Sequence, residues 1–307
     1  MTESAEWSVA SGVGFTALVA AAARAVESRR AFPLLRDPHA EAFVLAAALP
    51  SALPTTPEAA AGDPAFPWSQ VNDYVAVRSR FFDDFFAAAV CGDAVGIRQV
   101  VILAAGLDTR AFRLDWPDDV TVYEVDAPLV LSFKEKVLAD RGARARCGRH
   151  AVGADLREDW PAALRGAGFD PARPTAWLAE ALLIYLPDEA KASLLAAVQA
   201  LSAPGSHVAI DHITSPRADE ESNAAFREAA RRTGFDVDVD TLWSGEHDYD
   251  PAAWLRAGGW SVYVSPITAM ARQYGRPLAP TLPVGMLATV LATARKPGLS
   301  TERRHLA

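Results

Sequence analysis

QVVILAAGLDTRAFRLDWPDDVTVYEVD, residues 99–126, is the stretch that decides the fold. It begins with an apolar strand, turns at Gly106, continues in a short helix and ends in a second strand whose last residue is acidic. Asp126 follows Gly106 by twenty residues. In nucleotide-binding α/β folds this spacing places a carboxylate at the tip of the second strand, level with the first turn, where it accepts hydrogen bonds from ribose hydroxyls. The stretch therefore predicts a site for a cofactor that contains a nucleoside.

The turn around Gly106 indicates which nucleoside cofactor to expect. A dinucleotide site needs a G-x-G-x-x-G turn that lets the backbone approach a pyrophosphate. Here the turn reads AAGLDT, with one glycine, and Asp108 stands where a phosphate would need positive potential. This favours S-adenosyl-L-methionine, which has a sulfonium, an ammonium and a carboxylate but no phosphate. The alternative is that Gly106 only permits a tight turn and Asp108 caps the following helix.

Composition restricts the class of protein. The chain has 307 residues, half of them hydrophobic, so it can bury a large core. Its 30 basic and 38 acidic residues give a net charge of -8, which argues against nucleic acid as a partner. Its two cysteines, Cys91 and Cys147, form neither a disulfide framework nor a C-x-x-C metal site. We therefore expect a cytoplasmic protein without a bound metal.

The apolar stretch 15–23 resembles the core of a signal peptide or a membrane anchor. Glu3 and Glu6 precede it where a signal peptide would be basic, and Arg24 ends it far short of the roughly 20 residues that span a bilayer. We expect it to be a helix of the folded domain, and we expect no contact with a membrane.

Apolar periodicity predicts an α/β architecture. Helical patterns precede the first strand and form an N-terminal cap, after which strands and helices alternate, as in a parallel sheet covered by helices on both faces. Two further strands bring the number to seven, although periodicity does not give their direction. The predicted helices are 16–28, 38–48, 72–90, 129–140, 159–167, 189–201 and 254–257, and the predicted strands are 100–103, 120–125, 149–153, 176–179, 208–211, 260–264 and 286–294.

Acidic residues follow three further strands, at the edge of the sheet where ligands bind in such folds. Asp155 and Asp211 have ordinary alternatives, since the first could cap the next helix and the second could begin a turn. Glu180 interrupts an otherwise apolar run from 176 to 186. A buried carboxylate without a partner costs several kcal/mol, so Glu180 should have either a partner or a ligand.

Several ordered motifs resemble the leucine carboxyl methyltransferase-like family of class I S-adenosyl-L-methionine-dependent methyltransferases, especially bacterial members that act on polyketides. The similarity runs from about residue 13 to residue 296. The motifs are TALVAAAARAVESRR, RDPHAEAFV, YVAVRSRFFDDFF, LAAGLDTRAFRL, YEVDAPLVLSFKEKVL, DLREDWPAAL and WLAEALLIYLP. The resemblance implies one domain over 1–307 with a Rossmann-like fold: a helical cap (1–95), a cofactor-binding core (96–213), a helical insertion after strand five (214–250) and final core elements (251–297).

The resemblance also implies roles for residues at the amino-acid end of the cofactor. Arg78 would form a salt bridge with the methionine carboxylate, and Gly106 would lie under the methionine moiety. Glu180 would meet the amino-acid end near the point of methyl transfer. Ala181 departs from the family pattern, because relatives often have glycine there, and its side chain would narrow the approach to the backbone.

For the nucleoside end, the resemblance implies that Asp126 binds the ribose hydroxyls. Asp155 and Leu156 would flank the adenine, with the carboxylate accepting from its amino group. The assignment of Asp126 agrees with the spacing argument given above.

Whether methyl transfer needs a general base depends on the acceptor. A carboxylate acceptor is ionised near neutral pH and needs no general base, whereas a phenol needs a base or a low pKa of its own. Candidate bases are His212, His247, Tyr185 and Tyr274, and each could equally be a surface or packing residue. The sequence therefore assigns no catalytic base.

Segment 214–250 is long for a connection and contains Trp243, which suits a lid over the acceptor, although a solvated helical insertion fits equally. Its arginines, Arg217, Arg227, Arg231 and Arg232, could attract an acidic acceptor or pair with Asp219, Glu220, Glu221 and Glu228. The function expected is O-methylation of a carboxylate or phenolic hydroxyl on a small natural product or peptide. A dinucleotide-dependent oxidoreductase and a cofactor-binding protein without transfer activity are the alternatives; the sequence leaves the acceptor and the oligomeric state open.

Overall fold

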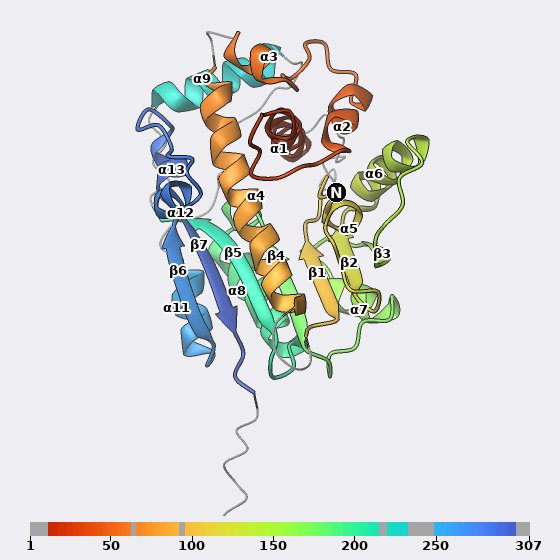
Figure 1. Ribbon diagram of the computed structural model, residues 1–307. Helices are drawn as coiled ribbons and strands as arrows, with labels where there is room; N and C mark the ends of the chain where they lie inside the picture. The colour runs from red at the N-terminus through yellow and green to blue at the C-terminus, as the bar shows by residue number, and fades with distance from the viewer. Residues whose placement is uncertain (1–11, 63–65, 92–95, 215–219, 233–248, 299–307) are drawn as a thin grey trace, which may run out of the picture.

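A seven-stranded sheet organises the computed structural model, which describes residues 12–62, 66–91, 96–214, 220–232 and 249–298 (Figure 1). The strand order is β3-β2-β1-β4-β5-β7-β6. The first five strands are parallel, and β7 runs antiparallel to both β5 and β6. The order reverses between β1 and β4, which is the switch point where ligands bind in open α/β sheets. The strands are β1 (Gln99–Leu103), β2 (Thr121–Asp126), β3 (Gly148–Gly153), β4 (Thr175–Ala179), β5 (His207–Ile213), β6 (Ser261–Pro266) and β7 (Thr289–Arg295).

The central strands are buried on both faces. All five positions of β1 and of β4 are buried, as expected for parallel strands between two layers of helices. Leu103 pairs with Val125 of β2 and with Ala179 of β4, so three strands end level with one another. The residues that follow them, including Gly106, Asp126 and Glu180, are thereby brought to one edge of the sheet.

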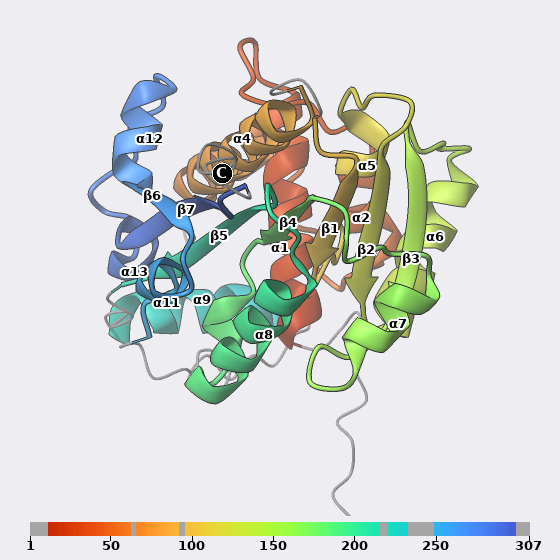
Figure 2. The ribbon, with the colours of Figure 1, turned by 90° about the horizontal axis from the view of Figure 1, so that it is seen from below.

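Two layers of helices cover the sheet, and side chains of β1 alternate between them. Val100 and Ile102 pack toward α1, α4 and α12, whereas Val101 and Leu103 pack toward α7, α8 and α11. Figure 2 shows α4 on one side of the sheet and α7 and α8 on the other. The Rossmann-like arrangement with helices on both faces is confirmed. The helices are α1 (Gly12–Ser28), α2 (Ala40–Ala46), α3 (Pro57–Ala61), α4 (Trp68–Cys91), α5 (Arg110–Arg113), α6 (Pro128–Asp140), α7 (Trp160–Gly166), η1 (Leu183–Tyr185), α8 (Asp188–Leu201), α9 (Glu220–Arg232), α11 (Pro251–Ala257), α12 (Ile267–Gln273) and α13 (Val284–Leu287).

Several short helices differ from the sequence prediction. No helix was predicted between 48 and 72, yet this stretch contains α3, which Thr56 caps by accepting a hydrogen bond from the Ala59 amide at 3.2 Å. The strand predicted at 286–294 begins only at Thr289, because α13 occupies the residues before it. Short helices of this kind carry too few periodic residues to be separated from a turn or a strand.

The insertion predicted at 214–250 is described only in part. Its described helix is α9, and residues 215–219 and 233–248, which include Arg217, Trp243 and His247, lie outside the described ranges. On α9, Arg231 pairs with Glu228 at 2.9 Å, so the pairing alternative holds for this arginine. No helix in the described ranges combines the length and apolar character that spanning a bilayer requires.

Candidate functional site

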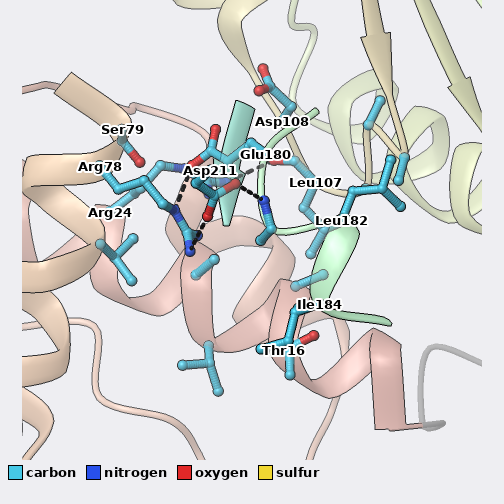
Figure 3. Close-up of a pocket in the computed structure, with 18 of the residues that line it drawn as sticks. Thr16, Arg24, Arg78, Ser79, Leu107, Asp108, Glu180, Leu182, Ile184 and Asp211 are labelled. Carbon is cyan, nitrogen blue, oxygen red and sulfur yellow. Dashed lines mark hydrogen bonds and ion pairs between the residues drawn. The ribbon is translucent and has the colours of Figure 1, made fainter. Parts of the chain in front are cut away.

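A cavity of about 300 Å³ lies at the carboxyl edge of the sheet, beneath helices α1 and α4. The turns after β1 and β4 line it, together with Asp126 at the end of β2 and the last residues of β5. Figure 3 shows the Arg78, Glu180 and Asp211 side chains meeting in this cavity. Thr16 and Ile184, which also line it, lie away from this charged group, toward the lower right of the view. The cavity therefore has an end where charged groups gather and a wall without charge.

Asp126 and Gly106 are joined directly. The Gly106 amide donates to one oxygen of the Asp126 carboxylate at 2.6 Å, and the Ala127 amide donates to the other at 2.7 Å. Gly106 has a φ of +47°, a left-handed conformation that favours glycine. Burial raises the pKa of Asp126 above its usual value, although these two amides oppose the rise. The predicted position of Asp126, level with the first turn, is confirmed, and its carboxylate is fixed in direction.

Glu180 has the partners that its burial demands. One carboxylate oxygen accepts from Nε of Arg78 at 3.0 Å, and the other accepts from Arg110 at 2.8 Å. Arg78 also lies 3.6 Å from the carboxylate of Asp211. Burial alone would raise the pKa of Glu180, but the guanidinium groups of Arg110 and Arg78 hold it below its usual value. Glu180 is therefore an ionised group on the cavity wall.

Arg110 was not anticipated by the sequence argument, yet it is the centre of this charge network. Its side chain is buried and pairs with Asp83 at 2.8 Å, with Asp108 and with Glu180. Asp108 also accepts a hydrogen bond from the Arg110 amide at 2.6 Å, at the start of α5. Thr109, not Asp108, is the N-cap residue of α5, although the Asp108 carboxylate binds the first helical amide from one residue earlier. Because Arg110 neutralises its charge, Asp108 alone does not select a cationic ligand. Arg110 lowers the pKa of Asp108 to about 2, against the effect of burial.

A second buried cluster of side chains holds the turn after β1 in place. Arg24 of α1 donates to the Leu107 carbonyl at 2.7 Å and to Asp37 at 2.9 Å. Asp37 also accepts from the Thr109 hydroxyl at 2.7 Å and from the Ala40 amide at 3.1 Å, where α2 begins. Arg24 and Asp37 therefore hold the turn after β1 in place, although they lie 83 and 72 residues from their partners Leu107 and Thr109. Their spacing in the sequence gave no sign of this contact.

Ala181 adopts a conformation that suits glycine. Its φ is +50°, and its amide donates to Asp211 at 2.6 Å. An alanine in this region costs roughly 1–2 kcal/mol. Ala181 therefore carries backbone strain that a glycine would not have, in addition to the narrowed approach expected from the sequence.

Asp155 and Leu156 do not contribute to the described lining of the cavity. Asp155 forms an ion pair with Arg157 at 2.5 Å, and Leu156 packs against the apolar cluster around α7 and α8. Asp155 does not cap α7, because Asp159 takes that position and accepts from the Ala162 amide at 3.1 Å. The contact of Asp155 and Leu156 with adenine remains a prediction.

The four candidate bases divide into distinct groups. Tyr185 and His212 line the cavity, whereas the Tyr274 hydroxyl donates to Asp84 at 2.9 Å outside the lining. His247 lies outside the described residues. Burial raises the pKa of Tyr185 and lowers the pKa of His212, so both are uncharged near neutral pH. In the described ranges, no three His, Cys, Asp or Glu side chains come together as a metal site.

Comparison with protein families and curated proteins gives one consistent result. The family model described as leucine carboxyl methyltransferase matches residues 17–199. A Saccharopolyspora erythraea protein named as an S-adenosyl-L-methionine-dependent methyltransferase is 49% identical over 279 residues, 91% of this chain and 94% of that protein. A Mycolicibacterium vanbaalenii protein of the same name is 48% identical, covering 86% of this chain and 88% of that protein.

Among solved structures, a DUF574 family protein from Streptomyces avermitilis is similar with a TM-score of 0.53 and 19% identity, over 83% of this chain and 97% of that one. At this identity the likeness shows the fold alone. The family match and the curated relatives also show which family the chain belongs to. The chain belongs to the leucine carboxyl methyltransferase family of S-adenosyl-L-methionine-dependent methyltransferases.

Proposed function

We propose that the protein transfers a methyl group to oxygen, on a carboxylate or a phenolic hydroxyl of a small natural product or peptide. The observation that carries this proposal is the composition of one cavity. Its lining includes four of the residues expected at the cofactor, Arg78, Gly106, Asp126 and Glu180, beside a wall of uncharged side chains. An acceptor bound against that wall would lie next to the methyl donor.

The lining fits the parts of S-adenosyl-L-methionine. Each oxygen of Asp126 accepts one backbone hydrogen bond, which leaves capacity to accept a further one from a ribose hydroxyl. Glu180 is ionised and can accept from an ammonium group, and Arg78 can pair with a carboxylate. When bound, the cofactor supplies an electrophilic methyl group on a sulfonium that is a good leaving group.

A dinucleotide fits less well. All four arginines of the described lining, Arg24, Arg78, Arg110 and Arg113, are ion-paired with carboxylates of the protein. The helix after the turn, α5, has four residues, so it offers little dipole for a pyrophosphate. Both features support a cofactor without phosphate.

The protein's contribution to rate would be positioning and exclusion of water. Residues from η1, β5 and the segment before β7 supply the uncharged wall, namely Ile184, Tyr185, Ile213, Pro283 and Met286. These side chains would hold an apolar or aromatic acceptor and keep water from the methyl group. A carboxylate acceptor would then need no general base, whereas a hydroxyl would need a proton acceptor at the site.

The proposal is tested by incubating the purified protein with methyl-labelled S-adenosyl-L-methionine and a panel of phenols, carboxylic acids, amines and thiols. Label on oxygen is expected, and alkaline hydrolysis separates the products because it releases methanol from an ester but not from an ether. The Asp126→Ala variant serves as a control that should transfer little label. Transfer to nitrogen or sulfur alone would contradict the proposal.

A further inference from the structure

The uncharged wall of the cavity contains a glycine, Gly285, that the backbone does not require. Gly285 belongs to α13, the one-turn helix before β7, and lines the cavity together with Pro283 and Met286. Its φ lies outside the left-handed region that favours glycine, so an alanine could take the same conformation. Since glycine is also less favourable than alanine in a helical turn, the fold gains nothing from a glycine here.

The space beside Gly285 is enclosed but unfilled. Gly285 is buried, yet a Cβ atom built on it would lie 3.8 and 3.9 Å from the Cγ2 and Cδ1 atoms of Ile213. Apart from its chain neighbours and the backbone of its own helix, nothing else in the described ranges would lie within 4 Å of that Cβ. Ile213 itself lines the cavity, so this space is part of the cavity. A side chain at position 285 would therefore occupy volume that is open to a ligand.

Hydrogen bonds hold this part of the wall in place. The Thr289 hydroxyl donates to the Gly285 carbonyl at 3.3 Å and lies 3.0 Å from the Tyr74 hydroxyl of α4. Because threonine has one hydroxyl hydrogen, Tyr74 is the donor in the second bond. Tyr74 and Thr289 are both buried, and Tyr74 also lines the cavity. The link between α4 and α13 thus keeps the space beside Gly285 from closing.

The uncharged wall is longer than one aromatic ring. It is built from η1, which follows β4, from the end of β5, and from α13, which precedes β7. These three strands are neighbours in the sheet, and neighbouring strands lie about 4.8 Å apart, so the wall spans about 10 Å. A charged group placed against it would lose its hydration without gaining a partner, whereas an uncharged ring would gain from burial.

We propose that Gly285 determines the size of the acceptor, because it leaves room beside Ile213 for the second ring of a fused-ring phenol or fused-ring aromatic acid. The first ring would lie against η1, with the methyl-accepting oxygen directed toward the cofactor. This inference rests on the proposed function, since it specifies the acceptor of that same site.

The test is calorimetric titration of the protein saturated with S-adenosylhomocysteine. The probes differ by one ring: phenol and 2-naphthol form one pair, and benzoate and 2-naphthoate form the other. In at least one pair, we expect the two-ring member to bind at least about tenfold more tightly than the one-ring member.

Gly285→Val should lower the affinity for that two-ring probe at least about tenfold and change the affinity for the one-ring probe less than about threefold. The reason is that the new side chain fills space that only the second ring reaches. Gly285→Ala should show a smaller loss of the same kind, with a Tm equal to or above that of the wild type. Both variants should keep their affinity for S-adenosylhomocysteine within about twofold.

The matched control is Gly166→Val. Gly166 ends α7, and a Cβ built on it would also meet no described atom within 4 Å, but it is exposed and lies outside the cavity lining. This variant should bind every probe as the wild type does.

The inference is overturned if neither two-ring probe binds the saturated protein, or if the one-ring probes bind as tightly as the two-ring probes. It is also overturned if the Gly285 variants leave two-ring affinity unchanged or weaken both members of a pair equally. Failure of the wild type to bind S-adenosylhomocysteine would instead overturn the proposed function.

Discussion

Removing the charge of Glu180 tests whether the buried network serves the cofactor or only the fold. In Glu180→Gln, the side chain can still accept from one arginine but places an NH₂ group toward the other. Breaking a buried ion pair usually costs 3–5 kcal/mol. Here Arg110 keeps Asp83 and Asp108, and Arg78 keeps Asp211, so we expect a smaller loss of about 2 kcal/mol. For a chain of 307 residues this corresponds to a fall in Tm of about 3 °C.

The same substitution should weaken cofactor binding. If Glu180 accepts a charge-assisted hydrogen bond from the cofactor ammonium, its loss costs about 1.5–3 kcal/mol, or about 10- to 100-fold in affinity. Calorimetric titration with S-adenosylhomocysteine measures this directly. Tm is measured on the same preparation, so that the two effects are separated.

Glu124→Gln is the matched control. Glu124 is fully buried and also bridges two cations, Lys134 at 2.8 Å and Arg149 at 2.7 Å, but it lies outside the cavity lining. This variant should lose at least as much stability and keep its affinity for S-adenosylhomocysteine within about twofold. If both variants lose stability and neither loses affinity, Glu180 is structural and the reasoning about its role is refuted.

Three further substitutions test other parts of the site. Asp126→Ala removes the acceptor of the Gly106 and Ala127 amides, so it should lower the free energy of unfolding, measured in urea, by about 1–3 kcal/mol. It should also lower the affinity for S-adenosylhomocysteine at least about tenfold. An unchanged affinity would contradict the ribose role. Ala181→Gly relieves a φ of +50° and should raise stability by up to about 1 kcal/mol, whereas a lower Tm would show that the strain argument is wrong. Asp108 has a pKa of about 2, below its usual 3.8, so its ionised form stabilises the fold above about pH 4, and this stabilisation is lost as pH falls toward 2. Unfolding free energies between pH 5 and pH 2 should therefore fall less steeply in Asp108→Asn, and an unchanged slope would contradict this.

The elements that the sequence predicted well are those with local causes. Strands β1 and β4 are short apolar runs bounded by turns, and such runs occur where both faces of a strand are buried. The spacing from Gly106 to Asp126 follows from one strand, turn and strand unit, so its geometry could be inferred without the rest of the chain. The burial of Glu180 within an apolar run likewise predicted that it would have partners.

The identity of those partners could not be inferred, because it depends on tertiary structure. Arg110 and Glu180 are 70 residues apart, and Arg24 contacts Leu107 across 83 residues. Periodicity places a residue on a face but does not say which residue faces it.

Calorimetric titration of the wild-type protein with S-adenosylhomocysteine, with NADH in parallel, tests the central claim most directly. The cavity at the carboxyl edge of the sheet has the Asp126 carboxylate at the position expected for ribose and no unpaired arginine in its described lining. We therefore predict binding of S-adenosylhomocysteine in the micromolar range, weakened at least about tenfold in Asp126→Ala, and no binding of NADH. Binding of NADH without binding of S-adenosylhomocysteine would contradict the account.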